Sequence, residues 1–493
     1  MDYHHMEKAG LTVCLFLFIF FRAITTFGQQ QWAFDPASKK AYELTLDLEL
    51  PKAHEMFPSP ESPQETYVIS LAETLELLLE EDGEKYTDYQ ANFEKRKDRK
   101  TKLNSPDDLF LQAEIATQWA FVYFKFGHEF DAALNLREAY VVATQLKRRF
   151  PRYEAVNKTL ALLEIIIGSV PEKYNWVLGL LNIEGSVDDG LKLFESLELT
   201  NSPFKVEAEM LHALALGYVL QQPQKGVAMI HSIIAENSSA GLAPFIGGSL
   251  AMKSGDAGQA LILLNRLEEK QPHFRINYAE YLRGEIFLCK GEYLNSITAY
   301  RSFINQYKGQ NNIKDAYYKI GLCYWLNGNV NDAHSLFKQA RNIGKEVTEA
   351  DKYAARSMSD NELPHPKLTK ARYFTDGGYY NKAEAILDSV APAELLTKRD
   401  QLEYTYRRGR LAHKTGKLAR AKAFYKEVID GNGDSPWYFA PNASLQMGYL
   451  LYEEGNKADA EEYFEMALSY KKHEYKNSID TKARSALAQL GRK

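Results

Sequence analysis

The sequence has little cysteine, little net charge and no apolar run as long as the roughly 20 residues that span a bilayer. Only 3 of its 493 residues are cysteine, which excludes a small fold held together by disulfide bonds. Its 60 lysines and arginines nearly balance 65 aspartates and glutamates, so the formal charge of −5 gives no sign of a general nucleic-acid binder. With 45% apolar residues, the composition is that of a folded chain.

The N-terminus carries a short apolar segment that is typical of an export signal. Residues 11–21 read LTVCLFLFIFF, which is too short for a membrane-spanning helix but fits the apolar region of a signal peptide. The small residues Thr26 and Gly28 precede Gln29 at positions −3 and −1 of a cleavage site. We therefore expect residues 1–28 to be removed and the protein to be exported to the periplasm or cell envelope, or secreted. The alternative is an uncleaved segment that anchors the chain to a membrane.

A pattern of small residues recurs along most of the chain. In the segment NNIKDAYYKIGLCYWLNGNVNDAHSLFKQA, small residues stand at Gly321, Gly328, Ala333 and Ala340, as required where two helices of a hairpin cross closely. Six of the eight intervals between equivalent anchor positions lie between 34 and 39 residues. These anchors are Ala120, Leu178, Leu214, Gly248, Gly284, Gly321, Ala371, Gly409 and Gly448.

This spacing closely resembles that of the tetratricopeptide repeat. The resemblance implies an all-α fold, an α-solenoid of helical hairpins with helical caps. Residues 169–220 also resemble the inclusion-body-clearance family of tetratricopeptide proteins and uncharacterised exported repeat proteins of bacteria. The residues that carry this second resemblance are Val170-Pro171, Gly185, Gly190 and Asn201-Ser202-Pro203-Phe204.

The register of the repeats predicts how the rest of the chain is organised. We expect an N-terminal helical region over residues 29–104 and a first part of the array over 105–345. A polar interruption, which we interpret as a hinge, follows at 346–366. The second part of the array then covers 367–476, and a capping helix covers 477–493, with Ile479, Ala483, Ala486, Leu487 and Leu490 on one apolar face.

Patterns that carry catalysis or bind metals are incomplete in this sequence. Residues 247–251 read Gly-Gly-Ser-Leu-Ala, which lacks the last glycine of a nucleophile elbow and lies within a repeat helix. Residues 430–434 resemble the opening of a calcium loop, but the glycine and glutamate that complete such a loop are missing. We therefore expect no catalytic residue, no metal and no cofactor. Cys289 and Cys323 stand among apolar residues of predicted helices, so we expect buried free thiols.

The resemblance also implies a concave groove lined by the first helix of each hairpin. When the anchor is counted as position 8, positions 2, 5, 9, 12 and 13 commonly face this groove. Aromatic and basic residues at such positions suit the capture of a protein segment, whereas the alternative is that several of the tyrosines pack between repeats. The groove candidates are Tyr281, Tyr318, Trp325, Tyr406, Arg410, His413, Tyr449 and Tyr452.

These observations favour an exported, non-enzymatic scaffold that holds a protein or peptide in an aromatic groove, basic towards its C-terminal part. The asparagines of the chaperone-type carboxylate clamp are not reproduced. The alternative function is a structural subunit of an envelope assembly, which would show an exposed apolar patch on its convex face. An enzyme would instead need a pocket where carboxylates or histidines converge. We expect no nucleic-acid partner, and membrane contact only if the N-terminal segment is retained; the oligomeric state is open.

Overall fold

The computed structural model describes residues 31–99, 105–170, 179, 183–198, 200–237, 240–270, 272–359 and 363–491. The predicted signal peptide and Cys14 lie outside these residues. Within the described residues the fold is all-α and contains no strand, and its helices form the hairpins of an α-solenoid, as predicted. None of the described helices combines the length and the apolar character needed to cross a membrane.

The chain divides into two compact units, and each is described by itself. Unit 1 comprises the residues up to 78 and residues 84–212, and unit 2 comprises residues 79–83 and 213–493. The main boundary thus falls between residues 212 and 213. Residues 346–366, where we predicted a hinge, lie inside unit 2 and contain a helix, α19 (Glu349–Ser359).

Unit 1 is built from helices that pack on their neighbours in sequence. Residues 63–99 contribute α4 and α5. Ser105 caps α6, because its hydroxyl accepts a hydrogen bond from the Asp108 amide at 3.1 Å. The closest pairs are α6 with α7 and α8 with α10. The helices are α2 (Pro36–Leu46), α3 (Leu50–Met56), α4 (Pro63–Glu80), α5 (Gly83–Arg99), α6 (Pro106–Lys125), α7 (Glu129–Arg149), α8 (Val156–Gly168), α10 (Val187–Glu198) and the first part of α11 (Lys205–Tyr218).

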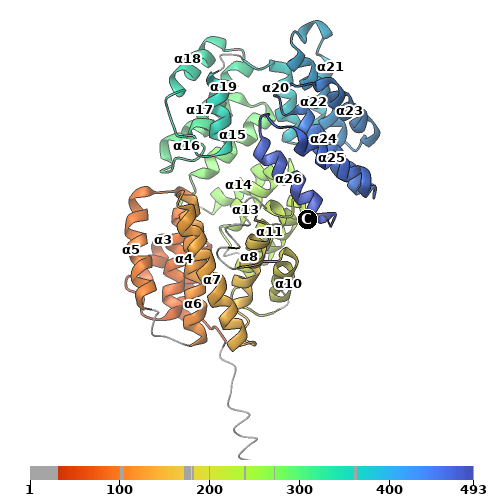
Figure 1. Ribbon diagram of the computed structural model, residues 1–493. Helices are drawn as coiled ribbons and strands as arrows, with labels where there is room; N and C mark the ends of the chain where they lie inside the picture. Colours follow the sequence, from red (N-terminus) through yellow and green to blue (C-terminus); the bar gives the residue numbers. More distant parts are fainter. Residues whose placement is uncertain are drawn as a thin grey trace, which may run out of the picture. The chain divides into compact units, whose positions relative to one another are not determined.

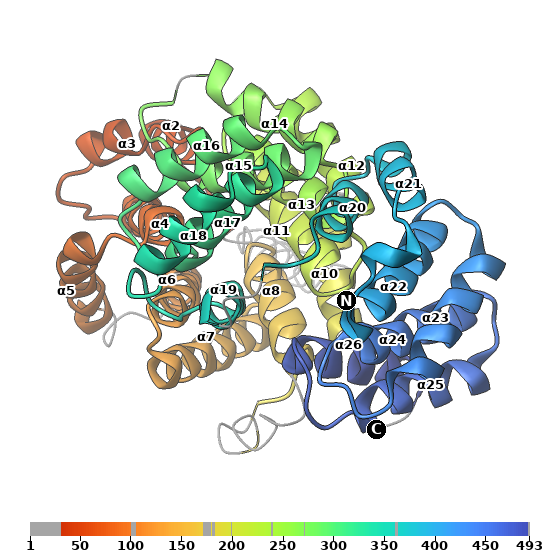
Figure 2. The same ribbon diagram turned by 90° about the horizontal axis from the view of Figure 1, so that it is seen from above.

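Unit 2 contains the regular repeats (Figures 1 and 2). Figure 2 shows α22, α23, α24 and α25 side by side, two hairpins in succession. The last helix, α26, packs on α24 and α25 and buries Ile479, Ala483 and Ala486 there, so the predicted apolar face is confirmed. The helices are α12 (Pro223–Glu236), α13 (Ala243–Ser254), α14 (Ala257–Glu269), α15 (Tyr278–Lys290), α16 (Tyr293–Gln306), α17 (Ile313–Leu326), α18 (Val330–Ala340), α19, α20 (Pro366–Asp376), α21 (Tyr380–Asp388), α22 (Lys398–Lys414), α23 (Leu418–Asn432), α24 (Phe439–Glu453), α25 (Lys457–Ser469) and α26 (Lys476–Gln489).

The anchor glycines explain why the hairpins need a small residue at this point. A Cβ atom on Gly284 would lie 2.5 Å from the ring of Tyr300, and one on Gly448 would lie 2.5 Å from the ring of Phe464. In each case the aromatic residue stands 16 positions further on, in the second helix of the hairpin. The turn between α15 and α16 uses Gly291 at φ 83°, which a residue with a side chain rarely adopts. The repeat pattern is therefore a packing requirement.

The core of unit 1 holds a buried ionic cluster. The Nζ of Lys158 donates to Glu114 Oε2 at 2.8 Å, to Glu207 Oε1 at 2.7 Å and to the Tyr67 hydroxyl at 2.7 Å. The hydroxyls of Tyr42 and Tyr67 donate to Glu207 Oε2 at 2.9 and 2.7 Å. Desolvation raises the pKa of Glu114, although the charge of Lys158 opposes this effect. The cluster joins α2, α4, α6, α8 and α11 within unit 1.

Candidate functional site

Unit 2 contains a cavity of about 550 Å³ with an aromatic lining. Side chains from α11, α13, α15, α17, α19 and α20 line it, together with Tyr475, which precedes α26. Two of the eight groove candidates, Tyr281 and Tyr318, are among them. The tyrosines of the lining are Tyr218, Tyr278, Tyr281, Tyr318, Tyr353, Tyr373 and Tyr475.

The tyrosines are held in place by contacts with one another. The rings of Tyr278 and Tyr281 stack at a centroid distance of 5.2 Å, and those of Tyr353 and Tyr475 stack at 5.0 Å. Tyr318 meets Tyr353 edge to face at 5.9 Å. Burial raises the pKa of Tyr281 and of Tyr318 well above its usual value, so both hydroxyls stay protonated near neutral pH. The cavity therefore offers rigid aromatic rings.

Some of the charged side chains that line the cavity neutralise one another. Lys319 pairs with Asp315 at 2.9 Å and with Glu285, and the Tyr281 hydroxyl donates to Asp315 at 2.6 Å. Lys253 is different, because its ammonium group lies over the ring of Tyr218, 5.1 Å from the centroid. Thus Glu285 and Asp315 are both paired with Lys319, whereas the ammonium group of Lys253 contacts the ring of Tyr218.

A second basic group at the cavity, Arg372, lies among aromatic rings. It pairs with Asp376, one turn away on α20, at 3.6 Å. The guanidinium group also lies over the ring of Tyr373, 5.5 Å from the centroid. Arg372 therefore presents a planar cation beside the tyrosines of the lining.

Most of this lining follows the groove positions of the repeat. Ser249, Met252 and Lys253 occupy positions 9, 12 and 13 of the repeat anchored at Gly248, and Arg372 occupies position 9 of the one anchored at Ala371. These residues were not among the groove candidates, although the same positional rule identifies them. Tyr353 and Tyr475 lie outside the repeat register, in α19 and before α26, so the rule gives no signal for them.

Three of the other groove candidates pack against protein in this structure. Tyr406 is 1% exposed and lies against Tyr438 and Phe439, with centroid distances of 5.7 and 5.6 Å. The indole of Trp325 donates to the Pro364 carbonyl at 3.0 Å. Tyr449 packs on Phe464 with ring centroids 5.3 Å apart.

The last three candidates, Arg410, His413 and Tyr452, do not line the cavity either. Arg410 donates to Gln446 Oε1 at 2.7 Å. Nδ1 of His413 lies 3.2 Å from the Tyr425 hydroxyl, and Tyr452 is 36% exposed. Burial, followed by the charges of Arg410 and Lys414, lowers the pKa of His413 to about 4, so this imidazole is neutral at pH 7. The structure thus brings Tyr281 and Tyr318 together and places the other six candidates elsewhere in unit 2.

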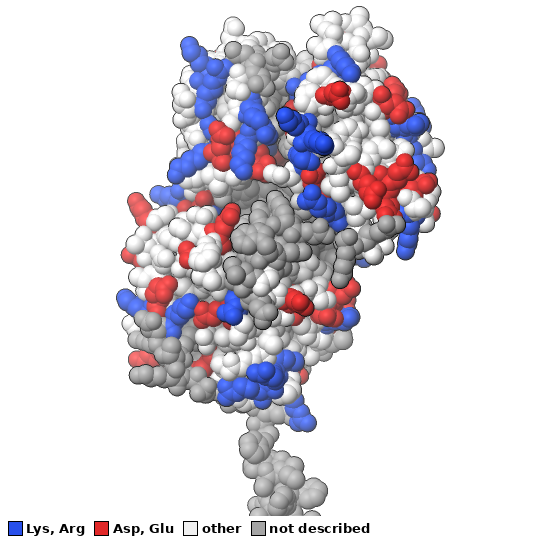
Figure 3. All heavy atoms as spheres, viewed as in Figure 1, with Lys and Arg blue, Asp and Glu red and all other residues white. Residues whose placement is uncertain are grey.

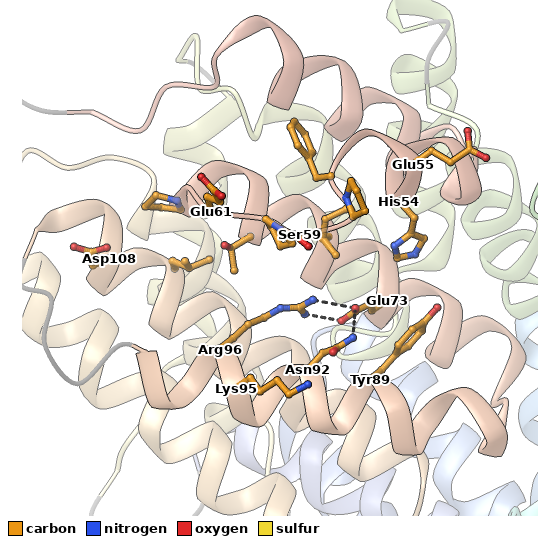
Figure 4. A pocket seen from close by; sticks show the side chains of 17 residues that line it. His54, Glu55, Ser59, Glu61, Glu73, Tyr89, Asn92, Lys95, Arg96 and Asp108 are labelled. Atoms are coloured by element: carbon orange, nitrogen blue, oxygen red, sulfur yellow. Dashed lines mark hydrogen bonds and ion pairs between the residues drawn. The ribbon is translucent and has the colours of Figure 1, made fainter.

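A second hollow, of about 820 Å³, lies in unit 1 (Figure 4). Its polar floor is Glu73, which accepts two hydrogen bonds from Arg96 and one from Asn92, the latter at 3.0 Å. His54 stacks on Tyr89 at its edge, with centroids 6.2 Å apart. Burial lowers the pKa of His54, so its imidazole is also neutral at pH 7. The charge of Glu73 is thus neutralised by Arg96 within the hollow.

An exposed apolar stripe follows one face of α7 in unit 1. Phe130, Leu134 and Val141 are 71%, 43% and 44% exposed, and their spacing of 4 and 7 residues places them on one helix face. Phe124, at the end of α6, is 69% exposed. Exposed apolar groups in series mark a surface that another molecule can cover.

The cysteines and the acidic groups offer little further chemistry. Cys289 and Cys323 are buried free thiols, as predicted. Burial raises the pKa of the Cys289 thiol well above its usual value, so it is a poor nucleophile. Among the described residues, no group of three or more histidine, cysteine, aspartate or glutamate side chains is arranged to hold a metal ion.

Comparison with protein families agrees with the repeat register. The family described as "Tetratricopeptide repeat" matches residues 406–477, which cover α23, α24 and α25 together with the end of α22. This segment holds the anchors Gly409 and Gly448. No curated protein matches the chain.

Solved structures that are similar to this chain include other repeat proteins. A tetratricopeptide repeat protein from Parabacteroides merdae is 16% identical and covers 57% of this chain and 98% of its own, with a TM-score of 0.26. The human IFIT1 dimer with PPP-AAAA is 14% identical, with coverages of 90% and 96% and a TM-score of 0.31. The tetratricopeptide domain of P58(IPK) is 17% identical, with coverages of 82% and 100% and a TM-score of 0.22. Likenesses this distant assign no ligand to the present chain.

Proposed function

Because this chain belongs to the tetratricopeptide-repeat superfamily, we propose that it is a non-enzymatic scaffold that binds a protein or peptide segment in the tyrosine-lined cavity of unit 2. The single observation that carries the proposal is the lining of this cavity. Rigid tyrosines cover apolar partner surface at little entropic cost and keep a hydroxyl for hydrogen bonding. A scaffold of this kind needs a surface that is organised before the partner arrives, and it makes or breaks no covalent bond.

An array of 12-residue peptides that is probed with the full chain tests this function. Tyr218→Ala is the most informative variant, because Tyr218 is 47% exposed and lies on the cavity beside Lys253. We expect this variant to weaken binding about tenfold, which corresponds to about 1.4 kcal/mol. Tyr463→Ala, on α25 and outside the cavity lining, is the matched control and should bind like the wild type. Equal binding by both variants and the wild type would exclude the cavity as the binding site.

Export is part of the same proposal, and the N-terminal sequence of residues 11–28 supports it. Expression with the native N-terminus and fractionation of the cells should place the protein in the envelope or outside the cell. Mass spectrometry should then find a chain that begins at Gln29. Recovery of intact chain in the membrane fraction would favour the anchored alternative, and intact chain in the cytoplasm would contradict export.

A structural subunit of an envelope assembly is the second candidate function, and the stripe on α7 favours it. Such a role uses a large permanent contact, for which exposed phenylalanine and leucine side chains are suited. Phe130→Ser combined with Leu134→Ser should leave the helical content unchanged and release any partner that copurifies in a fixed ratio. Unchanged copurification would count against this surface.

A further inference from the structure

One exposed side of α7 in unit 1 carries both apolar and basic side chains. The stripe of Phe130, Leu134 and Val141 continues to Arg148, because positions seven residues apart lie on the same side of a helix. We define the α7 face as the exposed positions that follow one another from Phe130 at intervals of three and four residues, and none of them is acidic. They are Phe130, Leu134, Arg137, Val141, Thr144 and Arg148. At 1.5 Å per residue the α7 face is about 27 Å long.

The acidic residues of α7 do not oppose the basic end of this face. Glu138 lies beside the face and is paired with Lys97 at 2.7 Å. Glu129 and Asp131 stand in the first turn of the helix, where carboxylates are favoured by the helix dipole. Negative charge on α7 is therefore either neutralised or placed at the end of the helix that is far from Arg148.

Four basic residues gather at the C-terminal end of α7. Figure 3 shows basic side chains at the lower end of unit 1, where α7 ends in Figure 1. Arg148 and Arg152 are exposed, and in the part of the chain that the structure describes neither forms an ion pair. The preference for cations at a helix C-terminus explains the residues of the last turn but not Arg152, which lies beyond the helix. The four are Lys147, Arg148, Arg149 and Arg152, against which Glu154 supplies one carboxylate.

The described residues begin at this same end of α7. The side chain of Gln31 donates to the backbone oxygen of Arg152, and its Oε1 accepts a hydrogen bond from the Glu154 amide at 3.0 Å. In the sequence, Gln31 follows the apolar segment 11–21 by ten residues, which can span at most about 36 Å. A retained segment would therefore hold this end of α7 close to a membrane surface. The end that carries the basic residues is thus the end that the anchored alternative would turn towards lipid.

We propose that the α7 face is a docking surface for an anionic lipid bilayer. Its apolar side chains enter the boundary between headgroups and acyl chains, while Arg148 and Arg152 meet the lipid phosphates. Exposed apolar groups next to cations without carboxylate partners match the two layers of such a surface. The proposal goes beyond the scaffold function and does not depend on it.

A lipid surface accounts for more of this region than the permanent protein contact of the second candidate function. Both partners would cover the apolar stripe. A permanent contact that buried Arg148 and Arg152 would have to supply a carboxylate to each, because a buried charge without a partner is costly. An anionic bilayer supplies phosphates at every point of its surface, so it needs no matched residues.

Sedimentation with lipid vesicles tests the proposal. The protein used is the chain that begins at Gln29, because it contains every described residue and lacks the apolar segment that could bind lipid by itself. Vesicles made of equal parts of phosphatidylglycerol and phosphatidylcholine should bind this chain about tenfold more tightly than phosphatidylcholine vesicles do. Raising the ionic strength to about 0.5 M should remove most of this preference, because salt screens the attraction.

The basic part of the surface is tested by Arg148→Gln combined with Arg152→Gln. This variant should bind the anionic vesicles about tenfold more weakly, since each basic residue near an anionic surface contributes to the attraction. Arg266→Gln combined with Arg420→Gln removes two exposed arginines of unit 2 and is the matched control. The control should bind like the wild type.

The apolar part is tested by Phe130→Ser combined with Leu134→Ser. This variant should also bind the anionic vesicles about tenfold more weakly, although it keeps every charge. Ile262→Ser combined with Leu294→Ser is the matched control, because these side chains are 62% and 65% exposed and lie in unit 2. Circular dichroism should show the same helical content in all four variants.

The possible outcomes separate a lipid surface from the other occupants. Absence of binding to anionic vesicles, or equal binding by the wild type and both α7 variants, would overturn the proposal and leave the scaffold function standing. Weaker binding by the arginine variant alone would show attraction by charge without insertion and would overturn the assignment of the α7 face. A protein that copurifies in a fixed ratio and is released by the serine variant, without vesicle binding, would assign the face to a protein partner instead.

Discussion

The Tyr281 hydroxyl donates to Asp315 Oδ2 at 2.6 Å, and this contact joins α15 to α17 at the floor of the cavity. Asp315 also forms an ion pair with Lys319 at 2.9 Å, so donors from two helices share one carboxylate. The ring of Tyr281 faces the cavity while its polar end holds neighbouring hairpins in register. One side chain therefore serves both the stacking of the repeats and the binding surface.

Tyr281→Phe separates these two roles. The variant keeps the ring and loses the hydrogen bond to a charged acceptor, so we expect unfolding to be easier by about 1.5 to 3 kcal/mol. Urea denaturation followed by circular dichroism measures this change, and peptide affinity should stay near the wild-type value. Tyr463→Phe is the control and should change the free energy of unfolding by less than about 0.5 kcal/mol. A large loss of affinity with normal stability would mean that the hydroxyl contacts the partner.

Gly321→Ala should destabilise unit 2, because the added methyl group would collide with the ring of Phe337. We expect a loss of about 1 to 3 kcal/mol from overpacking, despite the better helix propensity of alanine. Gly258→Ala is the control, since its new Cβ would have no contact closer than 3.5 Å and its helix should gain up to about 1 kcal/mol. Thermal denaturation of both variants measures the difference. Equal melting temperatures would contradict the packing requirement at the anchor.

Glu114→Gln should change how the stability of unit 1 depends on pH. Burial raises the pKa of Glu114 above its usual 4.5, so the folded state binds this proton more tightly than the unfolded state. The stabilisation is complete below pH 4.5 and is lost as the pH rises through the folded-state pKa. The pKa of Lys158 is also raised, so its charge persists through this range.

The measurement for this prediction is hydrogen exchange of the α8 amides at several pH values, corrected for the intrinsic rate. The excess stability of the wild type over Glu114→Gln should fall as the pH is raised from 4 to 8. Lys158→Met gives a second comparison and should cost about 3 to 5 kcal/mol, since it leaves two buried carboxylates without a cation. A pH-independent difference would show that the pKa of Glu114 is the same in the folded and unfolded states.

His413 should not titrate near neutral pH. Its folded-state pKa of about 4 lies below the usual 6.5, so the unfolded state takes up the proton first and stability falls as the pH drops from 6.5 towards 4. Nuclear magnetic resonance of the imidazole should show no change between pH 5.5 and 8. Arg410→Met should raise the pKa by removing a neighbouring charge, and Lys426→Gln should leave it unchanged. A midpoint near 6.5 in the wild type would contradict the burial of this ring.

Much of the fold could be predicted from the sequence because its determinants are local. Gly284 and Gly448 each face an aromatic ring 16 residues further on. This spacing can be read within a single repeat, and its recurrence along the chain makes the prediction of a repeat fold specific. The boundary between the two compact units carries no such signal. It falls between His212 and Ala213, inside a helix, where composition does not change.

The candidate site could be predicted only in part, for physical reasons. Tyr281 and Tyr318 follow from the repeat register, as do Tyr218, Lys253 and Arg372 when the register is applied to every repeat. Tyr406 occupies the same kind of position but is covered by Tyr438 and Phe439, which stand just before and at the start of the next hairpin. Position in a repeat gives the direction of a side chain, whereas its exposure depends on what the next repeat places over it.

The wall of the cavity formed by α19 has a consequence for how binding can change. Glu349 and Ala350 belong to an insertion outside the repeat register, so the stacking of the hairpins places few demands on their identity. Substitutions there can alter which segments fit while the anchors of the neighbouring hairpins stay as they are. Substitutions in α19 can thus change the shape of the cavity without changing the packing of the repeats. Related chains with the same repeats can therefore differ in their partners through α19 alone.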